Sequence, residues 1–253
     1  MKDNVEKNVQ RIIAFVQDYF KKNKLTGAII GISGGKDSAV CAALLTKALG
    51  KENVYGLWLP CDSNENDYHD AQVLANYYGF SLETFDLSKM YHDFVNMIKE
   101  QHQVDEKNLF DANINLKPRM RMMSLYYYAA MLTSMTKKKY IVAGTSNKCE
   151  KYVGYFTKGG DNVCDISLLG DLKVSEVIAI GEYLNVPKEI LYKTPSDGLR
   201  NISDEEVMHL KYADIEKYLD GEGDLLQETK ERIKHLHEIN QHKFIIPEYR
   251  KCD

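Results

Sequence analysis

The stretch Gly31–Ser38, with the sequence GISGGKDS, gathers residue types that could bind a phosphate group. Two adjacent glycines let the backbone approach a ligand closely, and successive N–H groups at the start of a helix attract an anion. Ser33 and Ser38 add hydroxyl donors. Asp37 is the exception, because its carboxylate would repel a phosphate unless a cation lay between them. Mg²⁺ suits that place, since it binds few protein carboxylates and completes its shell with phosphate oxygens and water. The pattern indicates a nucleotide-phosphate site with a metal-binding acid.

Neither of two common glycine-rich nucleotide motifs is present. The stretch lacks the G-x-x-x-x-G-K-[ST] spacing of a Walker A loop, and it lacks G-x-G-x-x-G. The alternative interpretation is a tight strand-to-helix turn capped by serine, which this stretch alone leaves open.

The elements that must position this stretch follow from the apolar pattern of the chain. An apolar run at 26–32 predicts a buried strand, and residues 37–49 predict a helix that ends near Gly50. Further strands are predicted at 53–60, 81–87 and 140–145, and helices at 5–20, 66–79, 89–100, 174–184 and 204–219. Strands that alternate with helices predict an α/β fold, an open parallel sheet with helices on both faces. Such sheets bind ligands at the carboxyl ends of their strands.

A long helix is predicted to follow the polar stretch 101–114. Pro118 fits its first turn, because the proline ring presets φ and the missing N–H would be unpaired there anyway. Residues 120–135 are apolar nearly all round. Such a helix is either the core helix of a monomer or lies at a contact between subunits.

Length and composition indicate an ordinary folded protein. The 253 residues are 44 % hydrophobic and 28 % charged, so we expect residues 1–253 to form a single domain. A formal net charge of −4 gives no reason to expect a nucleic-acid partner. The cysteines form no Cys-x-x-Cys pair, which argues against a zinc site or a disulfide framework. The N-terminal segment does not read as a signal peptide and no apolar run is long enough to span a membrane, so the expected location is the cytoplasm.

The sequence SGGKDS after a predicted strand resembles the PP-loop of the ATP pyrophosphatase superfamily, whose members cleave ATP between the α and β phosphates. Later segments resemble one family within it, the NAD synthetases. GTSNKCEKYVGYFTKGGDNVCDI at 144–166 is similar to that family's G-T-x-N-x-x-E, G-[YF]-x-T-K-x-G-D and D-I pattern. NLKPRMRM at 115–122 is similar to N-x-x-A-R-x-R-M, and further similar segments lie at 59–71, 185–199 and 241–247. The matches occur in order over nearly the whole chain, so they are specific jointly although each alone is weak.

This resemblance implies a sheet of the adenine-nucleotide alpha hydrolase type and an ATP-dependent ligase. In the family, the nicotinate carboxylate of deamido-NAD attacks the α phosphate of ATP and releases pyrophosphate, and ammonia then displaces AMP to give NAD. No covalent nucleophile is needed, because the enzyme mainly positions groups and neutralises charge. No amidase domain is evident, which implies the ammonia-dependent form, with a separate glutaminase as one source of ammonia. ATP and Mg²⁺ are the implied cofactors, and a homodimer is the implied assembly.

The resemblance also implies roles for individual residues. ATP would contact the PP-loop and three positions beyond it, namely Gly31, Ile32, Ser33, Gly34, Gly35, Lys36, Asp37, Ser38, Thr145, Lys173 and Ser196. Mg²⁺ would be held by Asp37 and Glu150. The dinucleotide substrate needs cations that offset its charge, and its contacts would be Arg119, Lys158, Asp165, His242 and Lys243. The residues closest to the chemistry would be Asp37, Lys158 and Asp165.

Each of these roles has a plainer alternative. Glu150 could be a solvated acid after a loop, and Arg119 could be a helix-surface charge. Ser196 could be a helix cap or turn residue, and His242 and Lys243 could lie in a solvated tail.

The chain departs from the family pattern beside the expected ATP site. A lysine that commonly contacts the ATP phosphates maps to Val174, and the adjacent Lys173 would point about 100° away on a helix. Leu168 and Asp197 replace a proline and an alanine of the pattern. Two alternatives therefore stand beside NAD synthesis. One is a related ligase that acts on a different carboxylate, and the other is a paralogue that binds ATP without turnover.

Overall fold

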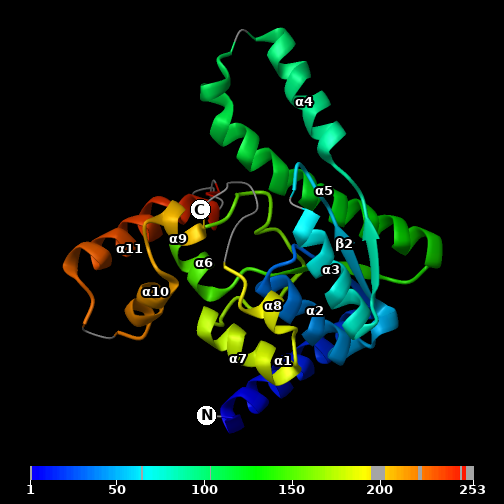
Figure 1. The fold of residues 1–253 in the computed structure, drawn as a ribbon. Helices are drawn as coiled ribbons and strands as arrows, with labels where there is room; N and C mark the ends of the chain where they lie inside the picture. Colours follow the sequence, from blue (N-terminus) through cyan, green and yellow to red (C-terminus); the bar gives the residue numbers. More distant parts are fainter. Residues whose placement is uncertain are drawn as a thin grey trace, which may run out of the picture.

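A five-stranded parallel sheet forms the centre of the computed structural model (Figure 1). The structure describes residues 2–63, 65–102, 104–194, 203–221, 224–245 and 247–248. Strand order is β3-β2-β1-β4-β5, with β1 (Gly27–Gly31), β2 (Val54–Trp58), β3 (Ser81–Thr84), β4 (Tyr140–Gly144) and β5 (Ile166–Ser167). Because β1 pairs with β2 on one side and β4 on the other, the strand order reverses between β1 and β4. Open α/β sheets bind ligands at this point.

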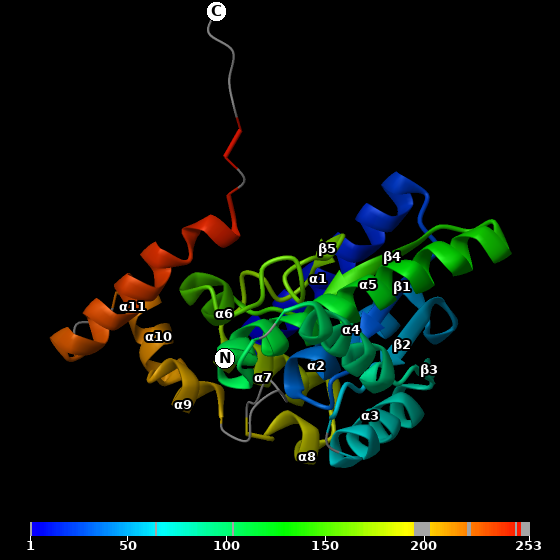
Figure 2. The same ribbon diagram turned by 90° about the horizontal axis from the view of Figure 1, so that it is seen from above.

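Helices cover both faces of the sheet, and this confirms the predicted fold class. Successive side chains of a strand point to opposite faces, so Ile30 packs on one face and Ile29 on the other. Strands buried on both faces read as nearly continuous apolar runs, as the sequence does here. The first face carries α1 (Lys2–Asn23), α2 (Lys36–Leu49), α3 (Glu65–Tyr78) and α7 (Val174–Leu184), and the second carries α4 (Ser88–Gln101) and α5 (Phe110–Thr136) (Figure 2).

A smaller helical cluster with its own apolar core lies beside the sheet. Val153, Ile215 and Ile233 are among its buried residues. It is built from α6 (Lys148–Val153), α9 (Asp204–Met208), α10 (Tyr212–Leu219) and α11 (Gln227–Ile239), and α10 also packs on α7. The remaining short elements are η1 (Lys51–Asn53), η2 (Glu106–Leu109), α8 (Lys188–Leu191) and η3 (Gln241–Lys243).

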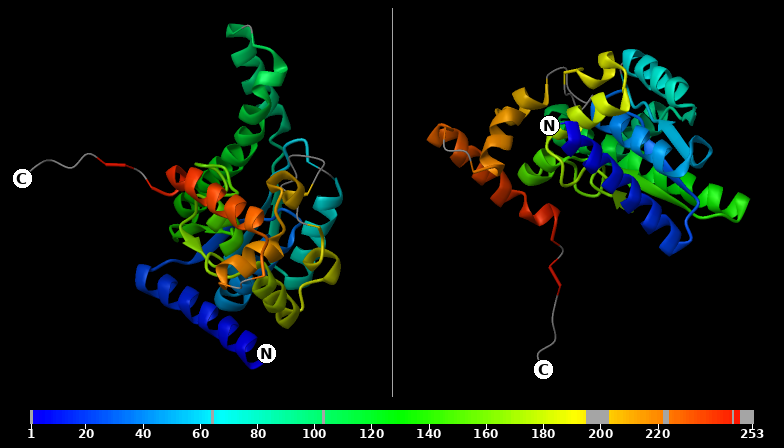
Figure 3. Two further views of the ribbon diagram at one scale, coloured as in Figure 1. Left: turned by 90° about the vertical axis from the view of Figure 1, so that its left-hand side faces the viewer. Right: turned by 90° about the horizontal axis from the view of Figure 1, so that it is seen from below.

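An arm made of α4 and the first half of α5 rises away from the sheet (Figures 1 and 3). Several of its apolar side chains are exposed, including Phe94, Met97 and Phe110. None of the helices in the described ranges combines enough length and hydropathy to cross a bilayer.

The position predicted for Pro118 is wrong. The helix α5 begins at Phe110, so the proline lies inside it and removes one backbone hydrogen bond. Tertiary contacts around it compensate for that loss. Leu116 packs with the core of the second face, and the Asn115 side chain accepts a hydrogen bond of 2.8 Å from the Thr157 hydroxyl. Helix propensity of a polar segment is a weak guide where such contacts exist.

Two other boundaries differ from the prediction. The helix predicted at 204–219 is two helices, because His209 between α9 and α10 adopts a left-handed φ of 53°. The strand β5 has only two residues, too few to show a period in the sequence, and it was not predicted.

Candidate active site

The PP-loop joins β1 to α2 in a conformation that requires its first glycine. Gly34 has φ of +79°, and a Cβ atom there would lie 2.7 Å from the backbone oxygen of Asp67. The two serines fix the loop from within. The Ser38 hydroxyl accepts from the Ser33 N–H at 3.2 Å and donates to the Gly35 carbonyl at 3.0 Å. No side chain caps the start of α2, so no capping side chain competes with a ligand for the first N–H groups of this helix.

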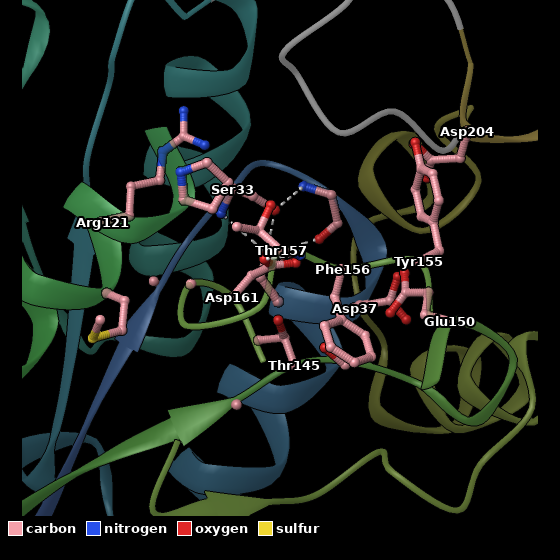
Figure 4. Close-up of a pocket in the computed structure, with 18 of the residues that line it drawn as sticks. Ser33, Asp37, Arg121, Thr145, Glu150, Tyr155, Phe156, Thr157, Asp161 and Asp204 are labelled. Carbon is pink, nitrogen blue, oxygen red and sulfur yellow. Dashed lines mark hydrogen bonds between the residues drawn. The ribbon is translucent and has the colours of Figure 1, made fainter. Parts of the chain in front are cut away.

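Two carboxylates meet beside this loop. Asp37 belongs to the first turn of α2, and Glu150 belongs to α6, which follows β4. Asn147 connects them, because its side-chain N–H donates to Asp37 Oδ1 at 3.2 Å and its backbone N–H donates to Glu150 Oε2 at 3.0 Å. Asn147 is completely buried. The connection therefore fixes the two acids relative to each other, and Figure 4 shows them side by side.

Lys36 brings a positive charge to the same place. Its Nζ lies 2.9 Å from Asp37 Oδ2 and 5.6 Å from the centre of the Tyr212 ring, and the side chain is only 6 % exposed. Burial disfavours the charged ammonium, but the Asp37 carboxylate more than compensates, so the pKa of Lys36 is raised. Burial and the charge of Asp37 raise the pKa of Glu150 well above its usual value, while Lys36 opposes that rise. The two acids repel each other, and the ammonium partly neutralises them.

Asp204 bounds this side of the site. It lies at the start of α9 and accepts hydrogen bonds from the hydroxyls of Tyr155 and Tyr212, both at 3.3 Å. Burial, followed by the charges of Glu150 and Asp204, raises the pKa of Tyr212, so this phenol stays protonated. Sequence reasoning missed Asp204 and both tyrosines, because the contacts among them arise only when α6, α9 and α10 pack together.

A cavity of 1210 Å³ extends from the PP-loop along the carboxyl ends of β1, β2 and β4. Asp37, Thr145 and Glu150, which the sequence resemblance assigns to the ATP and metal site, line it. The residues 31–38 all line it as well. Ser196 lies outside the described residues.

Arg121 and Lys243 supply cations to other parts of the cavity lining. Arg121 lies away from Glu150 in Figure 4 and donates to the Leu59 carbonyl at 3.0 Å and to the Ser63 hydroxyl at 3.2 Å. Lys243 donates to the carbonyls of Gly154 and Phe156 at 2.7 and 3.0 Å. Burial lowers the pKa of Lys243, against the opposing charge of Asp161. Arg121 and Lys243 are therefore candidates for contacts with an anionic substrate.

Arg121 was missed although the segment that holds it was recognised. Arg119 and Arg121 are two residues apart, so they point about 200° apart on α5. Only a known helix orientation shows which one faces the cavity, and sequence alone does not supply it.

Three of the predicted substrate residues form a chain of hydrogen bonds outside the cavity lining. Arg119 donates to the Lys158 carbonyl at 3.2 Å, and Lys158 Nζ donates to the His242 carbonyl at 2.6 Å. The chain ties α5, the 157–162 loop and the C-terminal segment together. Asp165 also lies outside the lining, where Val142 N–H and the Tyr126 hydroxyl donate to its carboxylate at 2.8 and 3.2 Å.

Lys173 and Val174 both face away from the phosphate site. Lys173 pairs with Asp220 at 2.7 Å and is not part of the cavity lining. Val174 is buried in the small apolar core with Cys149 and Ile215. Lys36, Lys193 and Arg121 line the cavity, whereas Lys173 does not.

Comparison with known proteins decides the family. The family model described as NAD synthase matches residues 8–247. The chain belongs to the NAD synthase family. It is 37 % identical over 250 residues to the NH(3)-dependent NAD(+) synthetase of Carboxydothermus hydrogenoformans, covering 98 % of each chain.

Solved structures of NAD synthase family relatives share the fold. An NMN synthetase from Francisella tularensis matches with a TM-score of 0.87 and 34 % identity, over 98 % of this chain and 99 % of that one. An NH3-dependent NAD synthetase from Campylobacter jejuni matches with a TM-score of 0.76 and 29 % identity, over the same shares. The resemblance seen in the sequence motifs is confirmed, and the chain is an enzyme of this family type.

The acid pair of this NAD synthase family member fits Mg²⁺. The donors at the site are carboxylate oxygens, which hard cations prefer, and Asn147 fixes both acids. Within the described residues, no group of three or more histidine, cysteine, aspartate or glutamate side chains could hold a metal by itself. A pair of carboxylates suits Mg²⁺, which keeps its remaining positions for water and substrate phosphates.

Proposed function

We propose that this chain uses ATP to adenylate the nicotinate carboxylate of deamido-NAD and then amidates it with ammonia, giving NAD, AMP and pyrophosphate. One observation carries the proposal. The PP-loop and the fixed pair Asp37 and Glu150 share one cavity with Arg121 and Lys243. That arrangement joins a triphosphate site with a metal-binding acid pair to an anion-binding region, as a reaction between two charged nucleotides requires.

The chemistry asks for positioning and charge neutralisation. A carboxylate is a poor acyl electrophile, since its oxygen is a poor leaving group. Attack of a carboxylate oxygen on the α phosphate forms one P–O bond and breaks the bond to pyrophosphate. Ammonia then adds to the acyl carbon, loses a proton and expels AMP. The PP-loop N–H groups and Lys36 would hold the phosphates, and water-excluded donors would stabilise the charge that develops.

The bound metal would supply charge neutralisation between the phosphates and the acids Asp37 and Glu150. Both acids would hold it, while Thr145 at the end of β4 would contact ATP. The remaining predicted substrate residues, Arg119, Lys158, Asp165 and His242, stay candidates for contacts to the dinucleotide.

A second candidate substrate is nicotinate mononucleotide. The match to the NMN synthetase has the higher TM-score, 0.87 against 0.76 for the NAD synthetase from Campylobacter jejuni. The same adenylation and amidation of a nicotinate carboxylate would then give the mononucleotide amide. The chemistry at Asp37 is unchanged between the two candidates, and only the part of the cavity that receives the rest of the substrate differs.

One assay separates these candidates. The protein is incubated with ATP, Mg²⁺ and ammonium, and with either deamido-NAD or nicotinate mononucleotide, and AMP and the amide product are measured. We expect AMP and NAD with deamido-NAD. A higher kcat/KM for the mononucleotide would favour the second candidate, and ATP binding without AMP release from either would contradict both.

We also propose that the active form is a homodimer joined near α4 and α5. The support is the apolar surface that these helices leave exposed in the single chain.

A further inference from the structure

We propose that the Lys36 ammonium is an internal counter-ion, which occupies the acid pair when no metal is bound and is displaced from Asp37 when the divalent cation arrives. This inference rests on the proposed function in one respect, because it takes Asp37 and Glu150 to be the metal-binding acids. It adds a role for Lys36 that the motif alone does not assign.

The first support is the geometry of the pair. Lys36 Nζ is 2.9 Å from Asp37 Oδ2, while the other oxygen, Oδ1, accepts from Asn147 at 3.2 Å. Both oxygens of the acid are therefore engaged by donors within the protein. A metal that binds Asp37 through Oδ2 would lie close to the ammonium, and the repulsion between the two cations favours displacement of the ammonium.

The second support is the degree of burial. The Lys36 side chain is 6 % exposed and that of Asp37 is 18 % exposed, so this pair is not one of the solvent-screened surface contacts that contribute little. A buried carboxylate without a counter-charge is costly, and Glu150 is a second acid fixed nearby through Asn147. The ammonium removes that cost in the metal-free protein.

The third support is what surrounds the ammonium. Its acidic neighbours are Asp37, Glu150 and Asp204, and the Tyr212 ring lies 5.6 Å from Nζ. An aromatic face and a second acid can keep a displaced ammonium within the site. Lys36 also lines the cavity, so after displacement it faces the substrate phosphates. Lys36 therefore supplies a positive charge on this side of the cavity.

The test measures metal binding by the protein without nucleotide. Mn²⁺ alone is the probe, because it prefers the same oxygen donors as Mg²⁺ and its binding is read by water-proton relaxation. Lys36→Met removes the charge and keeps most of the side-chain volume. We expect this variant to bind Mn²⁺ at least about tenfold more tightly than wild type, because the metal no longer competes with an ammonium for Asp37. Its metal-free melting temperature should fall and recover on adding Mn²⁺.

The control is Lys173→Met, which removes a lysine that pairs with Asp220 outside the cavity lining. Its Mn²⁺ affinity should equal that of wild type. Unchanged or weaker Mn²⁺ binding by a folded Lys36→Met protein would overturn the proposal, as would an equal gain in the control. If the metal-free Lys36→Met variant does not fold, Mn²⁺ present during refolding should restore the cooperative melt, and failure of that rescue also counts against it.

The outcome is separable from that of the proposed function. Tighter Mn²⁺ binding by Lys36→Met in a protein that amidates neither nucleotide would leave the counter-ion in place and refute the ligase activity. If wild type amidates a nucleotide but Lys36→Met shows no change in Mn²⁺ affinity, the ligase activity stands and the counter-ion proposal is refuted.

Discussion

At the scale of single residues, the site depends on charges held close together by a neutral side chain. Asn147 donates to both acids, and the Glu150 N–H in turn donates to the Asn147 side-chain oxygen at 3.0 Å. Two carboxylates in a partly dehydrated site repel each other, so they stay ionised only with a cation nearby. An acid pair of this kind is therefore costly without a cation, and Asn147 and Lys36 together stabilise it.

Removing the charge of Asp37 should nearly abolish turnover. Asp37→Asn keeps the size of the side chain but weakens the interaction with the cation that bridges to the phosphates. We expect AMP formation to fall by about 100-fold or more, the scale seen when one electrostatic contact to a transition state is lost. Glu150 remains near Lys36, so the fold should persist, and a cooperative thermal melt checks this. Wild-type AMP formation at every Mg²⁺ concentration would show that Asp37 does not act at this step.

Lys173 should contribute little to catalysis. Its Nζ bonds both oxygens of Asp220, at 2.7 and 2.9 Å, on a partly exposed surface. Lys173→Ala should leave kcat and the KM for ATP within about twofold of wild type and cost roughly 0–1 kcal/mol of stability. A large rise in the KM for ATP would instead assign this lysine to the phosphates.

Val174 tests the same assignment from the other direction. The side chain is 8 % exposed and packs with Cys149 and Tyr212. Val174→Lys would bury an ammonium in that cluster, so we expect a loss of about 2–5 kcal/mol in the free energy of unfolding and no gain in ATP turnover. A stable variant with faster AMP release would mean that the cluster opens toward the cavity.

At the scale of elements, the PP-loop is a strand-to-helix turn whose shape is set by one glycine. A side chain at Gly34 would meet the backbone of α3 at Asp67, and its φ of +79° is unfavourable for other residues. At Gly35, φ is −105°, and an added Cβ would meet only the Ser33 hydroxyl at 3.4 Å. The backbone conformation and close packing therefore require glycine at position 34, but they do not require it at position 35.

This difference predicts unequal effects of alanine at the two positions. Gly34→Ala should lower the free energy of unfolding by about 1–3 kcal/mol, because strain and the clash with Asp67 add. Gly35→Ala should change it by less than about 1 kcal/mol. Denaturant unfolding of both variants measures the difference. Equal losses would mean that the loop tolerates a shift of α3.

The apolar pattern predicted most elements because it reports burial, which is what the sheet and its helices share. The helix at 174–184 and the strands β1, β2 and β4 follow it closely. The start of α5 was missed because a polar segment is held helical by contacts of Asn115 and Leu116 that no local pattern records. In the site, the motif gave the PP-loop and Glu150. Asn147, Asp204 and Arg121 were missed as contributors, since their roles depend on which elements meet in three dimensions.

At the scale of the whole molecule, α4 and α5 expose several large apolar side chains. The middle and end of α5 expose Met123, Tyr127 and Met135, and α4 exposes Phe94 and Met97. The sequence left two interpretations of the long helix, the core of a monomer or a subunit contact. Its exposure in the single chain favours the second, because soluble proteins rarely leave such apolar area in water.

A homodimer through this surface should therefore exist at micromolar concentration. A contact of the usual size buries about 1,200–2,000 Å² in total, and we expect the contact to involve the arm and the exposed side of α5. Sedimentation velocity should give twice the mass of the chain for wild type. Tyr127→Glu, at a side chain that is 73 % exposed in the single chain, should shift the protein to monomers, because a buried carboxylate without a partner destabilises an interface. Leu226→Glu is the matched control, since Leu226 is equally exposed, at 75 %, but lies at the start of α11 away from this surface. A monomeric wild type would contradict the dimer. Dissociation by Leu226→Glu but not by Tyr127→Glu would place the contact elsewhere.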